Sequence, residues 1–347
     1  MNCIQRVILT LTAAAALTGG AAAQEAGKKK IACTIPALRS IAAEIAGDGF
    51  EIFALSRPDQ DVHFVSPTPS LVNKVRAAEL FIQIGLQLEI WAPEVANGAG
   101  NAKIQPGREG SIVASAGIPR EDIPKGAISR SEGDVHPEGN PHIWIDPIRA
   151  KQIAENIAAA LKKVSPGVAK EIDERLEKFK NRIDESVFGA DLVKLVGSKK
   201  LTRLALDGEL WSFLEANEAE GAKLATRAGG WLKKAEPLRG VAVIEFHRTW
   251  IYLAKLLGFQ IVGAIEAKPG IEPGPKHLAD LIETVKSKKA RLILVDNFYD
   301  VGKPRHVAEQ TGAKVVVLPG QPGGEPGTDD YISFIDRVVT DMVNGLK

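Results

Sequence analysis

The sequence predicts an α/β fold with two lobes, each a mostly parallel sheet flanked by helices, joined by a long rigid helix. Short apolar runs alternate with helical patterns near both ends of the chain, and this alternation is typical of parallel sheets with crossover helices. The 347 residues suffice for about two domains at roughly 150 residues each. A charge-dense helical stretch lies between the two alternating regions, where it fits a strut between lobes.

Residues 1–23 have the pattern of a secretory signal peptide. Arg6 precedes an apolar run from Val7 to about Leu17, and three alanines end the segment at Ala23. The apolar run is shorter than the roughly 20 residues that a membrane span needs. We therefore expect export to the periplasm with cleavage after Ala23.

Charge and cysteine content narrow the function classes. Residues 1–23 contain Arg6 and no acidic residue, so their removal lowers the formal net charge from +1 to 0. A neutral chain gives no electrostatic reason to expect nucleic-acid binding. Once residues 1–23 are removed, Cys33 is the one cysteine that remains, so we expect no internal disulfide in the exported chain. The apolar surroundings of Cys33 predict a buried, unreactive thiol.

The first lobe is predicted over residues 24–165. Apolar runs at 31–35, 50–55 and 80–84 predict strands. A helix is expected between the first two strands, ended by Gly47 and Gly49, and another begins near Ser70, a residue suited to N-capping. A long helix is predicted over 147–164, with Pro147 in its first turn.

A linking helix is predicted over 166–188, followed by the second lobe over 189–347. Ile172, Leu176, Phe179 and Ile183 form an apolar stripe on the otherwise charged linking helix. The alternative interpretation of this charged stretch is a solvent-exposed helix of a single domain rather than a strut between two lobes. Residues 189–240 read as a helical insertion without strand signals. The expected strands then lie at 241–246, 261–264, 291–295 and 315–318, and the main helices at 250–257, 276–288 and 331–343.

Several catalytic motifs are absent from the sequence. We find no G-x-G-x-x-G after the first strand, no G-x-x-x-x-G-K-[ST], no G-x-S-x-G and no H-E-x-x-H. A nucleotide-dependent enzyme or a serine hydrolase therefore has no positive support.

The six histidines carry more information. His63, His142 and His247 lie at expected strand ends or just before helices, where open α/β sheets place their ligand sites. Imidazoles brought together from separate segments suit a zinc ion. His277 and His306 lie within helical patterns, so we expect them at the surface. His136 lies in a Pro/Gly-rich loop, and we expect a solvated residue there that contributes little to metal binding.

Three segments resemble the cluster A-I (ZnuA/TroA-like) substrate-binding proteins of metal ABC transporters. They are "DVHFVSPTPSLVNKVRAAELFIQIGLQLEIW", "GNPHIWIDPIRAKQIAENIAAAL" and "VIEFHRTWIYLAKLLGF", and they occur in the family's order. The resemblance implies His63, His142 and His247 as metal ligands. It also implies a monomer that captures a metal ion between two lobes with modest hinge motion and delivers the ion to an ABC transporter permease.

The fourth ligand position departs from the family pattern. Many members have an aspartate after the last core strand, where this chain reads "VVVLPGQPGGEPGTDDY". Asp329 and Asp330 lie too near Tyr331 to align with that aspartate. The site is then completed by water, or by Asp296, Gln321 or Glu325, and we weakly favour Asp296.

The ligand type favours Zn(II) as the transported ion. Three imidazoles without an evident carboxylate suit zinc better than manganese, which prefers oxygen ligands. Another divalent metal such as Mn or Fe remains an alternative, as does a three-histidine zinc hydrolase or hydratase with bound water in the open position. A zinc store or an adhesin-like protein without a permease is a third class. Histidine ligation predicts that affinity falls below about pH 6.5.

Overall fold

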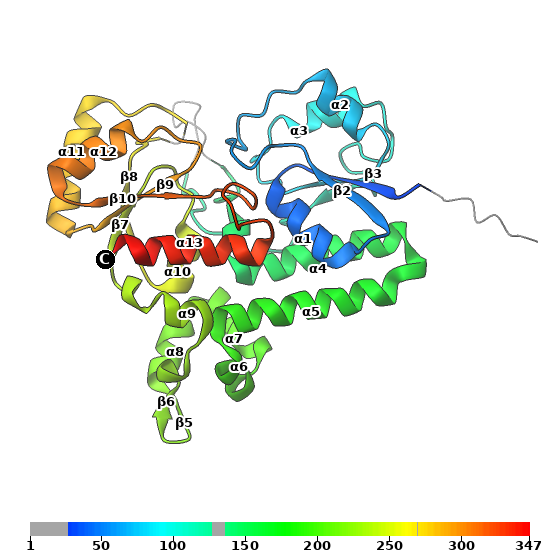
Figure 1. Ribbon diagram of the computed structural model, residues 1–347. Coiled ribbons are helices and arrows are strands. Elements are labelled where there is room, and N and C mark those ends of the chain that lie inside the picture. Colours follow the sequence, from blue (N-terminus) through cyan, green and yellow to red (C-terminus); the bar gives the residue numbers. More distant parts are fainter. Residues whose placement is uncertain (1–26, 127–135, 269) are drawn as a thin grey trace, which may run out of the picture.

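Two four-stranded sheets form the cores of two lobes, as the sequence predicts. The computed structural model describes residues 27–126, 136–268 and 270–347, so the predicted signal peptide lies outside the described residues. Figure 1 shows the lobes side by side, with the first sheet in blue and cyan and the second in yellow and orange. The first sheet has the order β2-β1-β3-β4 and the second the order β10-β9-β7-β8, and every neighbouring pair is parallel.

The strands have the following bounds. The first sheet contains β1 (Lys29–Cys33), β2 (Phe50–Ala54), β3 (Ala78–Gln83) and β4 (Ser111–Val113). The second contains β7 (Ala242–Glu245), β8 (Gln260–Ala264), β9 (Leu292–Asp296) and β10 (Lys314–Leu318). The sequence pattern did not reveal β4, since its three residues are too few for a periodic signal.

Helices cover both sheets and connect the lobes (Figure 1). Around the first sheet lie α1 (Pro36–Ala46), α2 (Pro69–Val75), α3 (Ala92–Gly98) and α4 (Pro147–Val164), with the short 3-10 helix η2 (Ile143–Ile145) before α4. The turn η3 (Pro166–Val168) leads into the long connecting helix α5 (Ala169–Phe188). Around the second sheet lie α10 (Ile251–Leu257), α11 (Pro275–Lys288), α12 (Gly302–Thr311) and α13 (Tyr331–Gly345).

Residues 189–240 are mainly helical but include a small hairpin. The helices are α6 (Ala190–Val196), α7 (Ser198–Leu206), α8 (Leu210–Ala216), α9 (Gly230–Lys234), η4 (Leu224–Arg227) and η5 (Glu236–Leu238). The expectation of no strand here is wrong, because β5 (Glu218–Ala219) pairs antiparallel with β6 (Ala222–Lys223). Glu220 and Gly221 both have positive φ, of 50° and 79°, as a two-residue hairpin turn requires.

The cap of α2 also differs from the expectation. Thr68, not Ser70, is the N-cap, and its hydroxyl oxygen accepts a hydrogen bond from the Leu71 amide at 3.3 Å. Pro69 then occupies the first helical position, which a proline fills without losing a hydrogen bond. The difference moves the N-cap by two residues, from Ser70 to Thr68, and leaves the placement of His63 unchanged.

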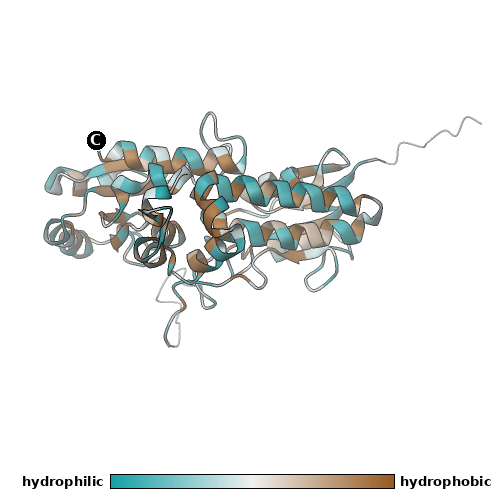
Figure 2. Cartoon of the chain, turned by 90° about the horizontal axis from the view of Figure 1, so that it is seen from below, coloured by the Kyte–Doolittle hydropathy of each residue, from teal (hydrophilic) through white to brown (hydrophobic). Residues whose placement is uncertain are grey.

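Helix α5 packs along α4 and presents an apolar stripe to the protein. Ile172, Leu176, Phe179 and Ile183 are all buried, and Figure 2 shows hydrophilic and hydrophobic segments alternating along the helix ribbons. A buried ion pair, Lys151 Nζ to Asp184 Oδ1 at 2.5 Å, also joins the two helices. The stripe that the sequence shows on this helix is thus a packing face, and the long connecting helix is confirmed.

One hydrophobic core runs through both lobes. It contains Ile31 and Leu38 of the first lobe together with Phe334 and Val338 of α13, and the buried, unpaired thiol of Cys33 belongs to it. Because apolar contacts rather than a single hinge join the lobes, large opening would expose core surface at a cost of about 25 cal/mol per Å². Among the described residues, no helix is both long and apolar enough to cross a membrane.

Candidate metal site

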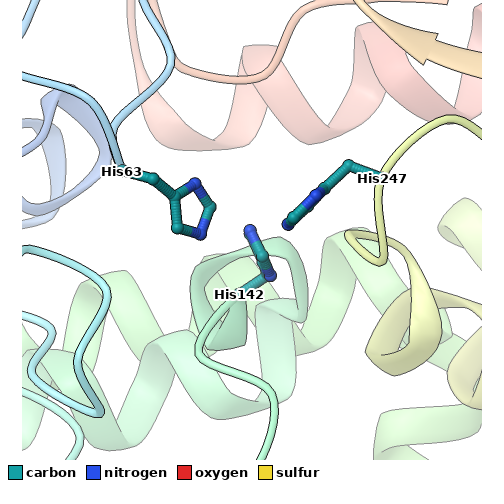
Figure 3. A group of neighbouring side chains, drawn as sticks. All are labelled: His63, His142 and His247. Atoms are coloured by element: carbon teal, nitrogen blue, oxygen red, sulfur yellow. The ribbon is translucent and has the colours of Figure 1, made fainter. Parts of the chain in front are cut away.

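Three of the histidines meet at the junction of the lobes. His247 follows the end of β7, His142 immediately precedes η2, and His63 lies in the connection between β2 and α2. The three side chains are buried, and one potential ligand atom from each lies within 4.8 Å of the others. Figure 3 shows the three rings directed toward a common point. Three segments that are far apart in the sequence therefore converge on one compact cluster of imidazoles.

The spacing of the rings suits a tetrahedral ion. Their centroids are 5.2 Å apart for His63 and His142, 5.0 Å for His63 and His247, and 5.1 Å for His142 and His247. A Zn–N bond of about 2.0–2.1 Å places each ring centre about 3.2 Å from the ion, so tetrahedral ligands have ring centres about 5.2 Å apart. Ligands at right angles, as in an octahedral site, would have ring centres about 4.5 Å apart.

The two histidines of the first lobe are held by the same local arrangement. Asp61 Oδ1 accepts hydrogen bonds from the backbone amide of His63 at 2.9 Å and from its Nδ1 at 2.8 Å. Asn140 Oδ1 does the same for the amide of His142 at 3.0 Å and for its Nδ1 at 2.9 Å. In each case a side-chain oxygen two residues earlier fixes both the backbone turn and the ring.

A carboxylate from another element holds the third histidine. Glu266, which follows β8, accepts from His247 Nδ1 at 2.8 Å and from the Gly270 amide at 3.0 Å. Since all three Nδ1 atoms face an acceptor, the three rings share the tautomer with hydrogen on Nδ1. That tautomer turns the Nε2 lone pair toward the cluster, as metal ligation requires.

Two of these partners also reach the opposite lobe. The Tyr299 hydroxyl donates to Asp61 Oδ2 at 3.0 Å, and Asn140 Nδ2 donates to the Arg248 carbonyl at 2.6 Å. Asp61 and Asn140 each therefore orient a histidine of the first lobe and bind the second lobe at the same time. Orientation of the histidine rings and docking of the lobes share these two side chains.

Burial controls the protonation of the site. Burial lowers the pKa of His142 well below its usual value, and the nearby His247 and His63 lower it further. Burial alone would raise the pKa of Asp61, but the hydrogen bond and charge of His63 lower it overall. The His142 imidazole thus stays neutral, the form that a metal site needs, at pH values below 6.5.

The candidates for a fourth ligand lie in different places. Asp296 and Gln321 line a small cavity next to His63 and His142. Burial and the charge of Asp61 raise the pKa of Asp296 to about 7, and the Thr249 hydroxyl donates to its Oδ2 at 3.3 Å. Asp296 is outside the group of ligand atoms within 4.8 Å of one another.

Gln321 has a structural partner in the other lobe. Its Oε1 accepts from the Ala37 amide at 3.0 Å, one of the amides at the start of α1 that have no partner within the helix. Glu325 is half-buried and does not line the cavity. Gln321 thus caps α1 from the second lobe.

His136 is not the solvated loop residue that the sequence suggests. Its side chain is only 8% exposed, and its ring centroid lies 5.5 Å from that of His63. The Pro/Gly-rich composition indicated a loop, but this loop is docked: Arg120 pairs with Glu138 at 2.9 Å, and the Asn140 amide donates to the Glu121 carbonyl at 2.8 Å. His306 is exposed, as its helical pattern predicts, whereas His277 is half-buried and its Nε2 lies 3.0 Å from the Ala264 carbonyl oxygen.

The acid sensitivity of the metal-free protein tests the environment of His136. Burial, with smaller effects from His63 and His247, lowers the pKa of His136 to about 3. Between about pH 6.5 and pH 3, the unfolded chain therefore binds a proton at this residue that the folded chain does not, and stability falls as the pH falls. We expect wild type to lose about 2 kcal/mol of unfolding free energy relative to His136→Gln between pH 7 and pH 5. Urea unfolding of both proteins at the two pH values measures this difference.

The comparison with His136→Gln isolates this one group. Burial raises the pKa of Glu245 to about 8 and that of Asp296 to about 7, and raised carboxyl pKa values change stability in the opposite direction. Both carboxyls are present in both proteins, so their contributions cancel in the difference. Parallel pH profiles would show that His136 titrates normally and is accessible to water.

Sequence reasoning missed the residues that orient the ligands. Asp61, Asn140, Glu266 and Tyr299 were not predicted. A signal for the first two exists, because a D-x-H and an N-x-H tripeptide each contain a predicted ligand histidine, and Asp or Asn two residues before a histidine can form this turn. Glu266 and Tyr299 have no local signal, since they meet their partners only through the tertiary fold.

A comparison with protein families assigns the chain. Residues 31–187 and 212–345 match the model of the ZnuA family, described as zinc-uptake complex component A, periplasmic. The chain belongs to the ZnuA family. ZnuA-family proteins are periplasmic metal-binding components of ABC transporters and are non-enzymatic. The chain is therefore a divalent metal-binding solute-binding protein for ABC transport, and the hydrolase or hydratase alternative is set aside.

Individual ZnuA-family relatives differ in the metal that their names state. The iron-binding protein YfeA of Yersinia pestis is 25% identical over 342 residues, covering 97% of this chain and 92% of YfeA. The zinc-binding lipoprotein AdcA of Streptococcus pneumoniae is 23% identical over 90% of this chain. The chain spans about half of AdcA, 55% of its length.

Solved structures confirm the ZnuA-like fold. A crystal structure of ZnuA has a TM-score of 0.66 and 21% identity, covering 92% of this chain and 100% of that one. The laminin-binding adhesin Lmb of Streptococcus agalactiae, in a mutant structure, has a TM-score of 0.67 and 20% identity at the same coverage. At these sequence identities, both similarities establish the fold alone.

Proposed function

We propose that this protein captures Zn(II) between its lobes with His63, His142 and His247 and delivers the ion to an ABC transporter permease. The observation that supports the proposal most is the cluster of three buried imidazoles with ligand atoms within 4.8 Å of one another. The three rings come from both lobes, so an ion bound by all of them is enclosed where the lobes meet.

The ring geometry supports zinc over a metal that prefers octahedral oxygen ligands. The centroid separations of 5.0–5.2 Å agree with the tetrahedral estimate of about 5.2 Å rather than the octahedral one of about 4.5 Å. The cluster also contains no carboxylate, the ligand type that suits manganese.

The surrounding charges support a divalent cation. Asp61 and Glu266 carry negative charge one hydrogen bond away from the ligands, so they offset the ion without coordinating it. Because they accept from Nδ1, they also make the imidazoles more basic ligands. The two negative charges of Asp61 and Glu266 thus equal the charge of one M²⁺ ion bound by three neutral imidazoles.

Export is the second part of the proposal. We propose that residues 1–23 direct the chain to the periplasm and are removed after Ala23, so that the mature chain begins at Gln24. Intact mass of the protein recovered from the periplasm tests the cleavage position. A mass that retains residues 1–23 would contradict it.

Metal competition tests the zinc assignment. The metal-free protein is mixed anaerobically with equimolar Zn(II), Mn(II) and Fe(II), and bound metal is measured by mass spectrometry after desalting. We expect about one zinc per chain and at least tenfold more zinc than manganese or iron, because tetrahedral imidazole ligation favours zinc.

Iron is the informative competitor because of the similarity to YfeA. Predominant binding of iron or manganese would replace zinc as the substrate and leave a metal-transport role in place. Absence of any bound metal would overturn the proposed function as a whole.

A further inference from the structure

We infer that His136 is the fourth ligand of the zinc site, so that the ion is held by four imidazoles. The inference rests on the proposed function and names a residue that completes the same site. It replaces water and the carboxylate candidates at the fourth position.

The first argument is the lack of hydrogen bonds at a buried ring. His136 is more than nine-tenths buried, and neither of its ring nitrogens makes a hydrogen bond of normal geometry; the Leu86 backbone has only a small, raising effect on its pKa. A buried polar atom without a partner costs about 1–3 kcal/mol, and an apolar side chain would fill the same space without that cost. A ligand that binds a ring nitrogen removes the penalty.

The second argument is position. The His136 and His63 rings are 5.5 Å apart and tilted by 34°, close to the separation of about 5.2 Å for two imidazoles on one tetrahedral ion. His136 is not part of the group whose ligand atoms all lie within 4.8 Å. Ligation therefore requires its ring to turn toward that group, and the turn gives up only the weak interaction with the Leu86 backbone.

The third argument is that the backbone of His136 is anchored beside the site. The Gly139 amide donates to the His136 carbonyl at 3.1 Å, which closes a turn. Gly139 has a φ of +108°, and a Cβ there would lie 2.8 Å from the Glu121 carbonyl oxygen. This turn leads directly into Asn140 and His142, so His136 and His142 are presented by one braced segment.

The other candidates are less suited to the fourth position. The Gln321 side-chain oxygen is used by the Ala37 amide, and Asp296 accepts from Thr249. Of these three side chains, His136 is the one whose potential ligand atoms are buried without a hydrogen bond of normal geometry to the described residues.

Zinc affinity and ligand counting together test this inference. Affinity is measured by competition with a chelator for wild type, His136→Gln, His142→Ala and the surface control His306→Gln. Zinc X-ray absorption counts the imidazoles in wild type and in His136→Gln. We expect His136→Gln to bind zinc at least tenfold more weakly, with four imidazoles in wild type and three in the variant, while His306→Gln matches wild type.

The outcomes separate this inference from the proposed function. If His142→Ala loses zinc but wild type shows three imidazoles, His136 is not a ligand and the proposed function stands. Weaker binding by His136→Gln with three imidazoles in both proteins also overturns the inference, since His136 then acts indirectly. If His142→Ala retains stoichiometric zinc, both the site and the inference are wrong.

Discussion

Replacing His142 by alanine is expected to weaken zinc binding roughly 100- to 1,000-fold. The free energy of a protein zinc site, about 10–16 kcal/mol for structural sites, is shared among a few ligands, so each contributes about 3–4 kcal/mol. His142 is buried and held at both its amide and Nδ1 by Asn140, so the variant loses an imidazole that is already oriented for ligation. Calorimetric titration of the metal-free protein with zinc measures the loss.

The same result is expected for His63→Ala and His247→Ala, because each contributes one atom to the cluster. His306→Ala is the matched control, since His306 is an exposed histidine on α12. The three cluster variants should unfold cooperatively without metal, which shows that binding rather than folding is lost. Stoichiometric zinc in all three cluster variants would contradict the site assignment.

The sequence was sufficient to predict the fold because the fold depends on local patterns. Strand runs such as 31–35 and helical repeats such as Leu38, Ile41 and Ile45 reflect which face of each element is buried. Their positions at strand ends or before helices singled out the three histidines that the structure brings together, and the resemblance implied them as ligands. Short elements without periodicity, β4 and the β5–β6 hairpin, were not predicted for the same reason.

Contacts between distant segments could not be predicted in this way. His136 was expected in solvent because its neighbours are proline and glycine, yet the loop is fixed by residues 120 and 121. Gln321 was a possible ligand on chain position alone, but its oxygen caps α1 of the other lobe. Both differences arise from how one lobe faces the other, which a local pattern does not encode.

Replacing Asn140 by alanine is expected to weaken zinc binding about 10- to 100-fold. This is the usual effect of removing a residue that orients a metal ligand. Asn140 acts at two places: its Oδ1 fixes the His142 ring, and its Nδ2 binds the Arg248 carbonyl, one residue from His247. Its loss therefore frees one ligand and loosens the segment that carries another. Asn97→Ala, at an exposed asparagine of α3, is the control.

Asp61, like Asn140, both orients a histidine and binds the opposite lobe. Tyr299→Phe separates these two roles of Asp61. The variant removes the hydroxyl that donates to Asp61 Oδ2 and leaves the Oδ1 bonds to His63 in place. If the bond between lobes contributes to affinity, Tyr299→Phe lowers zinc affinity even though the ligand-orienting bonds are intact, and we expect a smaller loss than for Asn140→Ala. Chelator competition measures both, and zinc dissociation rates should rise in the same order. Affinities within twofold of wild type for both variants would show that the ligands are positioned without these residues and that lobe docking is independent of the metal.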